Sequence, residues 1–363
     1  MIQVGVVGCG RISAQYLRTL RDRFGGVVKL AACADLNGEL AAAVAKEYEI
    51  PVATDPASLY AREDVEVVLN LTNPWAHREV NEAALAAGKH VYTEKPLALT
   101  RGDAQAIIDA GIAAGLRVGC APDTFLGAGL QTCRKLIDGG WIGSPSVIRG
   151  QITMHGARMM GRYQTNRIGG VLLDMGPYYV TAMIALFGPA HRVSGMIASA
   201  SGPARGSDPS ASSYGQHSDI ETPVTVAGTM EFQDGVLGQI VTTTVADRYG
   251  PSLEVVGSEG TLICNDPNMF GGPVLIKRGH GEPKEVELTH RYPEASRGLG
   301  LVEMMKAVEA GRPHRANAML GFHALDVMLS LLDSANSGTH IDLTSSCDRP
   351  APMPFGRHID PFV

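Results

Sequence analysis

The stretch Val4-Gly5-Val6-Val7-Gly8-Cys9-Gly10-Arg11-Ile12-Ser13 decides the first half of the fold. Its mostly apolar beginning predicts a buried strand, and Gly8, Gly10 and Ser13 occupy the three small-residue positions of a dinucleotide-binding turn. Gly8 permits the tight turn, Gly10 lets a pyrophosphate approach the backbone, and Ser13 replaces a third glycine. A helix that begins here would direct its N-terminal N–H groups at the phosphates. The alternative is an ordinary glycine-rich turn.

Strands and helices alternate through the first 120 residues. The strand segments are rich in valine and apolar on both faces, which is typical of parallel strands between two helix layers. We therefore predict an α/β fold that begins with a Rossmann domain, a doubly wound parallel sheet, over residues 1–122. The expected strands cover residues 3–7, 27–34, 65–71, 89–93 and 116–120, and the expected helices cover residues 12–23, 38–48, 76–87 and 100–114.

The pattern changes after about Pro122. Several segments alternate polar and apolar residues with a period of two, and Asp234-Gly235 is a strong signal for a hairpin. We predict an α+β domain with a large, mostly antiparallel sheet over residues 123–340, followed by an extended tail over residues 341–363. Its expected strands cover residues 146–154, 191–200, 222–232, 236–245, 253–257 and 261–264, and its expected helices cover residues 127–138, 298–310, 318–334 and a segment ending at 187.

Length and composition agree with two packed domains. The chain has 363 residues, of which 45% are hydrophobic and 19% are charged. A net charge of −6 argues against nucleic acid as a partner. The six cysteines are scattered without a CxxC pair, so we expect buried reduced thiols and no metal site.

The sequence also predicts a cytoplasmic location. The first strand follows Met1 so closely that no secretory signal fits before it. No apolar run approaches the ~18–20 residues of a membrane span, so we expect no membrane contact.

Asp35 closes the second expected strand, 22 positions after Ser13. An acidic residue at this spacing is typical of a ligand to the adenosine ribose. A carboxylate accepts hydrogen bonds from a 2′-hydroxyl and repels a 2′-phosphate, and Leu36-Asn37 adds no cation. We therefore expect NAD rather than NADP, although Arg11 could reach a phosphate.

Glu94-Lys95-Pro96 follows the apolar run at residues 90–93. Ligands of open α/β sheets gather at the carboxyl ends of the strands, so Lys95 is a candidate for proton transfer beside the nicotinamide. An ammonium with an ordinary pKa near 10.4 is a poor base. Burial and the charge of an oxidised nicotinamide would lower that pKa. Pro96 restricts Lys95 to an extended conformation. The alternative is a solvated lysine at a strand end.

Over nearly its whole length the chain resembles the family of glucose–fructose oxidoreductase and inositol dehydrogenase (Gfo/Idh/MocA). The resemblance rests on the first turn, Thr72-Asn73-Pro74 with His77, residues 88–91, Glu94-Lys95-Pro96-Leu97 and residues 169–176. It implies that Lys95 is catalytic, that Glu94 lies near the nicotinamide ribose and that residues 72–77 border the cofactor. It also implies sugar or polyol substrates and a homodimer or homotetramer formed through the second domain's sheet.

The second motif departs from the family. Asp174 is present, but four residues later stands Tyr178, where the family commonly has histidine. Residues i and i+4 share a helix face, so both side chains could point into a cleft. We hypothesise that Lys95 carries the proton, Asp174 orients its ammonium and Tyr178 hydrogen-bonds the reacting hydroxyl. In a variant of this hypothesis, Tyr178 itself carries the proton. Alternatively, Asp174 is only a helix N-cap and Tyr178 packs in the core.

The predicted function is hydride transfer between NAD and an alcohol carbon of a sugar, polyol or glycoside. The alternatives are a glycosidase that retains NAD and a non-catalytic NAD-sensing regulator. His314 and His323 are expected on the helices and surface of the second domain. The predicted cofactor ligands are Gly8, Gly10, Arg11, Ile12, Asp35, Thr72, Asn73, Pro74, His77, Glu94 and Lys95, and the predicted substrate ligands are Lys95, His155, Arg158, Tyr163, Asp174 and Tyr178.

Overall fold

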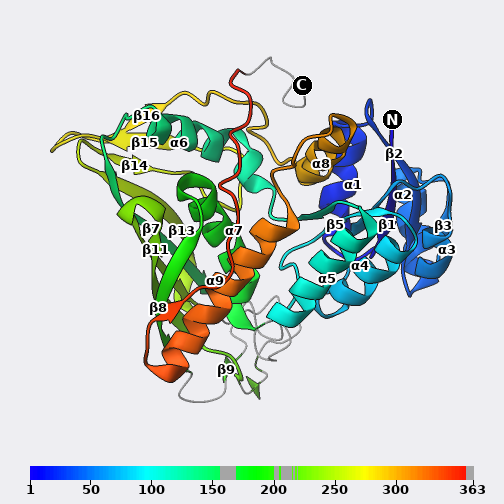
Figure 1. Ribbon diagram of the computed structural model, residues 1–363, viewed down its shortest axis with the longest axis horizontal. Helices are drawn as coiled ribbons and strands as arrows, with labels where there is room; N and C mark the ends of the chain where they lie inside the picture. Colours follow the sequence, from blue (N-terminus) through cyan, green and yellow to red (C-terminus); the bar gives the residue numbers. More distant parts are fainter. Residues whose placement is uncertain (156–168, 200–203, 206–214, 216, 219, 357–363) are drawn as a thin grey trace. The chain divides into compact units, whose positions relative to one another are not determined.

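The computed structural model (Figure 1) describes residues 1–155, 169–199, 204–205, 215, 217–218 and 220–356. The chain forms two compact units. Unit 1 contains residues 1–126 and 295–322, and unit 2 contains the described residues within 127–294 and 323–356.

Unit 1 is built on a six-stranded parallel sheet in the order β3-β2-β1-β4-β5-β6. This order confirms the predicted doubly wound sheet, and its switch point lies between β1 and β4. The central strands are buried on both faces, as parallel strands between helices must be. The strands are β1 (Ile2–Val7), β2 (Val28–Ala34), β3 (Ala53–Thr54), β4 (Val67–Asn70), β5 (His90–Thr93) and β6 (Val118–Cys120), and the helices are α1 (Ser13–Asp22), α2 (Gly38–Tyr48), α3 (Pro56–Tyr60), α4 (His77–Ala86) and α5 (Arg101–Ala114).

A segment from late in the chain also belongs to unit 1. It carries α8 (Leu299–Glu309) and the loop that precedes α9 (Ala318–Ser337). Beside β6, the Cys120 N–H donates a 3.0 Å hydrogen bond to the Ala316 carbonyl. The sequence analysis placed residues 295–322 in the second domain, because helical periodicity does not show which sheet a helix packs against.

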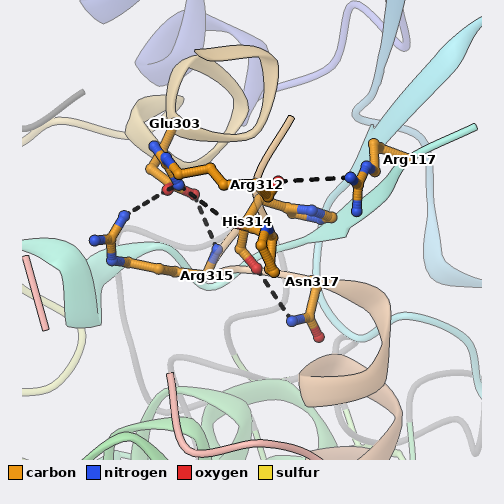
Figure 2. A network of polar contacts seen from close by, with 7 residues as sticks. Arg117, Glu303, Arg312, His314, Arg315 and Asn317 are labelled. Atoms are coloured by element: carbon orange, nitrogen blue, oxygen red, sulfur yellow. Dashed lines mark hydrogen bonds and ion pairs between the residues drawn. The ribbon is translucent and has the colours of Figure 1, made fainter. Parts of the chain in front are cut away.

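A buried ion cluster stabilises this returning segment (Figure 2). The Glu303 side chain is fully buried, and Oε1 accepts hydrogen bonds of 2.6 Å from both Arg312 and Arg315. Nearby, His314 Nε2 lies 3.2 Å from the Val118 carbonyl on β6. His314 is therefore buried in unit 1, and the expectation that it lies on the second domain's surface is wrong.

Unit 2 is built on a nine-stranded sheet in the order β16-β15-β14-β13-β7-β12-β11-β8-β17. Every pairing is antiparallel except β7 with β12, which confirms the predicted sheet. Asp234 and Gly235 both have positive φ, of 65° and 76°, in the hairpin that joins β11 to β12. The strands are β7 (Pro145–His155), β8 (Ala190–Ala198), β11 (Thr225–Phe232), β12 (Leu237–Thr243), β13 (Val245–Gly257), β14 (Thr261–Ile263), β15 (Val274–Lys277), β16 (Lys284–Val286) and β17 (Ile341–Asp342), with β9 (Ala204–Arg205) and β10 (His217–Ser218) as a separate pair.

Helix α7 (Gly170–Phe187) packs on this sheet beside α6 (Ala128–Asp138). A glycine on β7 allows the close approach, since a Cβ at Gly150 would lie 2.9 Å from both Tyr179 and Met183. Beyond β17 the chain continues without regular structure over α6, where the Met353 N–H donates to Gln131 Oε1 at 2.8 Å.

By length and composition, two helices in the described part of the chain could cross a membrane. Over an 18-residue window, α7 has a mean hydropathy of 1.4 and α9 of 1.3. The expectation that no apolar segment approaches the length of a membrane span is therefore wrong. However, the windows are 94% and 67% buried, and helices in a folded core pass the same test. The two helices are weak evidence for a membrane.

Candidate active site

The turn after β1 has one glycine that packs tightly and one that faces open space. At Gly8, φ is +98° and an added Cβ would lie 2.7 Å from the Leu71 carbonyl carbon. At Gly10, an added Cβ would meet nothing within 4 Å. Helix α1 begins beside it with Ile12 at the N-cap and without a side-chain hydrogen bond to the cap. An uncapped helix N-terminus beside free space fits a pyrophosphate.

Asp35 lies against this turn at the end of β2. Its Oδ2 accepts a 2.8 Å hydrogen bond from the Cys9 N–H, and Oδ1 accepts one of 2.9 Å from the Asn37 N–H. In the described part of the chain no ion pair involves Asp35. The carboxylate is thus fixed beside the phosphate turn with its charge uncompensated. Arg11 and Leu36 next to these residues are exposed.

Asn70, at the end of β4, organises the next loop. Its side chain is fully buried and donates to Asn81 Oδ1 at 2.8 Å. Its Oδ1 accepts hydrogen bonds from the Thr72 N–H at 3.1 Å and from the Thr72 hydroxyl at 2.6 Å. The sequence analysis missed this residue, although a polar residue at the end of a valine-rich strand is a usable signal. Asn73 and Pro74 follow in the loop ordered by this network.

His77 joins the loop after β4 to the loop after β5. The ring is fully buried, with Nδ1 2.8 Å from the Pro96 carbonyl and Nε2 3.2 Å from the Thr72 carbonyl. Burial lowers the pKa of His77, against the backbone carbonyls of Pro96 and Thr72, which favour the protonated ring. His77 therefore positions two loops of the predicted site.

Glu94 and Lys95 lie where β5 ends, next to β4, and the Glu94 N–H donates to the Asn70 carbonyl at 2.9 Å. The Glu94 side chain is buried, and its two oxygens accept hydrogen bonds from the Tyr16 hydroxyl at 2.7 Å and the Lys95 N–H at 2.8 Å. Lys95 is half-buried. Unit 1 thus places Lys95 and the phosphate turn at the same edge of one sheet, as the sequence predicts. Sequence reasoning missed Tyr16, which lies inside α1 and has no motif of its own.

In unit 2, Asp174 and Tyr178 lie on α7 with exposed fractions of 3% and 5%. The helix begins after Gly169, so Asp174 lies beyond its first turn, and the alternative that Asp174 is the N-cap is wrong. Pro177 lies inside the helix rather than in its first turn.

A second tyrosine, which the sequence analysis did not single out, lies near Tyr178. The Tyr249 hydroxyl donates to Asp266 Oδ2 at 2.8 Å. Burial first, then the charge of Asp266, raises the pKa of Tyr249, and Tyr178 contributes in the same direction. Tyr178 itself is buried among the core residues of unit 2.

The remaining predicted substrate ligands cannot be placed. His155 ends β7, but its side chain lies outside the described residues, as do Arg158 and Tyr163.

Family models match both halves of the chain. A model described as an oxidoreductase family with an NAD-binding Rossmann fold matches residues 2–121. A model described as the GFO/IDH/MocA C-terminal domain matches residues 130–263. The chain belongs to the Gfo/Idh/MocA family. The resemblance inferred from the first turn and from Glu94-Lys95-Pro96 is confirmed.

Other Gfo/Idh/MocA relatives are similar over part of the chain. Inositol 2-dehydrogenase of Salmonella typhimurium is 35% identical over 154 residues, which cover 41% of this chain and 45% of that protein. The Pseudomonas savastanoi pv. phaseolicola protein of the same name is 36% identical over 152 residues, covering 40% and 44%. These matches span less than half of the relatives' own length.

Solved structures share the fold over most of the chain. A levoglucosan dehydrogenase in complex with NADH and L-sorbose has a TM-score of 0.81 at 19% identity, covering 95% of this chain and 99% of that one. An NAD-binding oxidoreductase from Klebsiella pneumoniae has a TM-score of 0.81 at 20% identity, covering 94% and 98%. A putative NADPH-dependent oxidoreductase from Desulfitobacterium hafniense has the same TM-score and identity, covering 94% and 97%.

Proposed function

We propose that this Gfo/Idh/MocA protein is a cytoplasmic NAD-dependent dehydrogenase of a sugar or polyol. The observation that carries the proposal is that the open turn at Gly10 and the half-buried Lys95 occupy the same edge of the unit 1 sheet. The names of the inositol and levoglucosan dehydrogenases support the class of substrate. When bound, NAD+ would supply the acceptor for the hydride at nicotinamide C4.

In this proposal Lys95 accepts the hydroxyl proton of the substrate. As the carbinol carbon of the substrate loses its hydride, the hydroxyl proton would pass to Nζ of Lys95, and the carbonyl forms. A lysine acts as a base only in its neutral form. Asp174 would orient the ammonium that results, and Tyr178 would hydrogen-bond the reacting oxygen.

Turnover with two variants tests these roles. NADH formation is measured against aldoses, inositols and levoglucosan for the wild type, Lys95→Met and Tyr178→Phe. We expect Lys95→Met to lower kcat by at least about a hundredfold, in the range of general acid–base effects, and Tyr178→Phe to lower it by only about tenfold. If Tyr178→Phe loses as much as Lys95→Met, the tyrosine carries the proton. Full activity of Lys95→Met would contradict the proposal.

The same panel separates the alternative functions. Cleavage of a chromogenic glycoside without net NADH would indicate an NAD-retaining glycosidase. NADH binding without any turnover would indicate a non-catalytic sensor.

Asp35 supports NAD as the cofactor. Its carboxylate is anchored by the Cys9 and Asn37 N–H groups, and no ion pair among the described residues offsets its charge. A 2′-phosphate placed there would meet an uncompensated anion. The NADPH-dependent description of one structural neighbour makes a parallel assay with NADP necessary.

We also propose that the chain forms a homodimer or homotetramer through the unit 2 sheet. Along β11 and β12 buried and half-exposed residues alternate, so one face is not covered by the unit's own helices. That face includes Met196, with an exposed fraction of 78%, and Leu237, with 53%. Light scattering should give a mass above the 38.3 kDa monomer, and Met196→Glu with Leu237→Glu should reduce it.

A further inference from the structure

A buried asparagine in the middle of the unit 1 sheet fixes the orientation of the Thr72 hydroxyl. Asn70 ends β4, where it pairs with Val7 of β1 on one side and with Thr93 of β5 on the other. Its side chain is fully buried. The side-chain oxygen, Oδ1, accepts the Thr72 N–H at 3.1 Å and the Thr72 hydroxyl at 2.6 Å. One amide oxygen thus holds both polar groups at the start of the loop after β4.

The orientation of the Asn70 amide follows from its neighbours. A backbone N–H can only donate, so the Asn70 atom that faces the Thr72 N–H is the oxygen. The Nδ2 group then donates to Oδ1 of Asn81 on α4, also fully buried, at 2.8 Å. Because an amide oxygen has no proton to offer, the Thr72 hydroxyl gives its own proton to Asn70. The Thr72 oxygen therefore has only lone pairs left for a ligand, which makes it a hydrogen-bond acceptor.

The loops that carry the predicted cofactor ligands follow one another along the carboxyl edge of this sheet. In the strand order β2-β1-β4-β5, the loop with Asp35 comes first, then the phosphate turn, then Thr72 and Lys95. Thr72 lies against the turn, since a Cβ added at Gly8 would lie 2.8 Å from the Thr72 N atom. A dinucleotide that extends from Asp35 to Lys95 has its second ribose after the diphosphate, on the β4 side of the turn.

We propose that Asn70 is a positioning residue that makes Thr72 an acceptor for a hydroxyl of this second ribose, an inference that rests on the proposed NAD site. Phosphate oxygens accept hydrogen bonds and do not donate them at neutral pH, whereas ribose hydroxyls do both. A fixed acceptor at Thr72 thus disfavours the diphosphate and favours the ribose. Asn70 in this way sets how far the dinucleotide lies along the edge, with the diphosphate at Gly10 and the second ribose at Thr72.

Substitutions at three positions separate this role from a structural one. Thr72→Val removes the hydroxyl and keeps the N–H that bonds Asn70, whereas Thr72→Ser keeps both groups. Asn70→Ala removes the acceptor that orients the hydroxyl. Thr19→Val is the matched control, because the Thr19 hydroxyl is also buried in unit 1 but donates to the Gln15 carbonyl within α1, at 3.0 Å.

Three ligands locate the contact on the cofactor. ADP carries the adenosine and the diphosphate, ADP-ribose adds the second ribose, and NADH adds the nicotinamide. Calorimetric titration of the full-length protein measures the three affinities. We expect Thr72→Val to weaken NADH and ADP-ribose about tenfold and ADP by less than about twofold, the loss of one hydrogen bond. Thr72→Ser and Thr19→Val should bind all three ligands as the wild type does, and Asn70→Ala should follow the pattern of Thr72→Val.

Other patterns contradict the proposal. Equal losses for the three ligands in Thr72→Val, or no loss, would show that its hydroxyl does not contact the second ribose. Wild-type affinities in Asn70→Ala would show that Asn70 does not orient the hydroxyl. In either case NADH binding by the wild type leaves the proposed function standing. If the wild type binds neither NADH nor ADP, the proposed function fails and this inference fails with it.

A second measurement covers the case in which Asn70→Ala does not fold. A hydroxyl proton held by a buried acceptor exchanges slowly with water, so the Thr72 hydroxyl of the wild type should give a proton NMR signal that is absent in Thr72→Val. A Thr72 hydroxyl that exchanges as fast as a free one would overturn the orienting role of Asn70.

Discussion

Gly8 and Gly10 are two residues apart, but a glycine is favoured at the two positions for different reasons. Gly8 has positive φ, and an added Cβ would overlap the backbone of Leu71 and Thr72, so the fold itself requires a glycine there. At Gly10 an added Cβ would have no neighbour within 4 Å, so only a bound ligand would require a glycine.

Substituting alanine at each position separates these two reasons. We expect Gly8→Ala to lower the free energy of unfolding by about 3 kcal/mol, because its Cβ would overlap Leu71 and its φ suits only glycine. Gly10→Ala should change stability by less than about 0.5 kcal/mol and weaken NADH binding at least tenfold, about 1.4 kcal/mol. Urea unfolding and NADH fluorescence titration measure the two effects. Tight NADH binding by a stable Gly10→Ala protein would remove the phosphate site from this turn.

Asp35 is expected to determine whether the protein prefers NAD or NADP. Asp35→Ser removes the charge that repels a 2′-phosphate, together with acceptors for the Cys9 and Asn37 N–H groups. We expect the ratio of kcat/KM for NAD to that for NADP to fall about thirtyfold, about 2 kcal/mol. Glu39→Ser, an exposed change on α2, is the control and should leave the ratio alone. An unchanged ratio in Asp35→Ser would show that another residue selects the cofactor.

At the scale of single residues, the sequence reveals motifs but does not reveal which side chains become buried. The glycines, Asp35 and Lys95 could be found because their spacing relative to strands is distinctive. Tyr16 and Asn70 could not, because nothing in a linear sequence shows that a polar group will be buried against a partner far along the chain. Their hydrogen bonds appear only when α1, β4 and β5 are packed together.

At the scale of elements, α8 is attached to unit 1 through its N-terminus. Asp123, which follows β6, is fully buried, and its Oδ2 accepts hydrogen bonds from the Gly298 N–H at 2.8 Å and the Gly300 N–H at 3.0 Å. A carboxylate satisfies the free N–H groups and positive end of a helix N-terminus. Burial nevertheless raises the pKa of Asp123 from 3.8 to about 6, against the Gly300 N–H and Arg297.

This raised pKa predicts a pH dependence. The folded state binds the Asp123 proton more tightly than the unfolded state, so the contribution of Asp123 to stability is fully present below pH 3.8 and is lost as the pH rises through about 6. The full effect is of the order of 3 kcal/mol. Asp123→Asn keeps an acceptor for both N–H groups and cannot ionise, so its free energy of unfolding should change less with pH.

Urea unfolding at about pH 5 and about pH 7.5 measures this difference. The control is Asp109→Asn, an exposed change on α5 that should behave as the wild type. If Asp123→Asn shows the same pH dependence as the control, Asp123 does not titrate in this range.

At the scale of the whole molecule, local patterns predicted both sheets but not their full membership. Valine-rich runs and period-two alternation identify β1, β2, β4 to β8 and β11 to β14, and the Asp234-Gly235 turn fixes the β11–β12 hairpin. The strands β3, β15, β16 and β17 were missed, as was the separate β9–β10 pair, since all have two to four residues and little alternation. The return of residues 295–322 to unit 1 was missed because it depends on long-range contacts such as Asp123 with Gly298.

Long-range contacts also change how the chain responds to acid. His323 lies on α9 in unit 2, as expected, but it is fully buried rather than on the surface. Its Nε2 accepts the Ala190 N–H at 3.0 Å, and Nδ1 lies 2.8 Å from the Ser345 hydroxyl, which donates to Asp326. A proton added to Nε2 would point at the Ala190 N–H. The folded structure therefore requires the neutral His323 ring, with Nε2 as a hydrogen-bond acceptor.

Unit 2 should consequently be destabilised by acid through His323. Burial lowers the pKa of His323 from 6.5 to about 4, against the attraction of Asp326. The unfolded state then binds the proton first, so the stability present above pH 6.5 is lost as the pH falls through about 4, by an amount of the order of 3 kcal/mol. His323→Gln should lose less over this range, whereas His280→Gln, at an exposed position, should match the wild type. Thermal unfolding of the three proteins across the range measures this, and equal losses in all three would show that acid acts elsewhere.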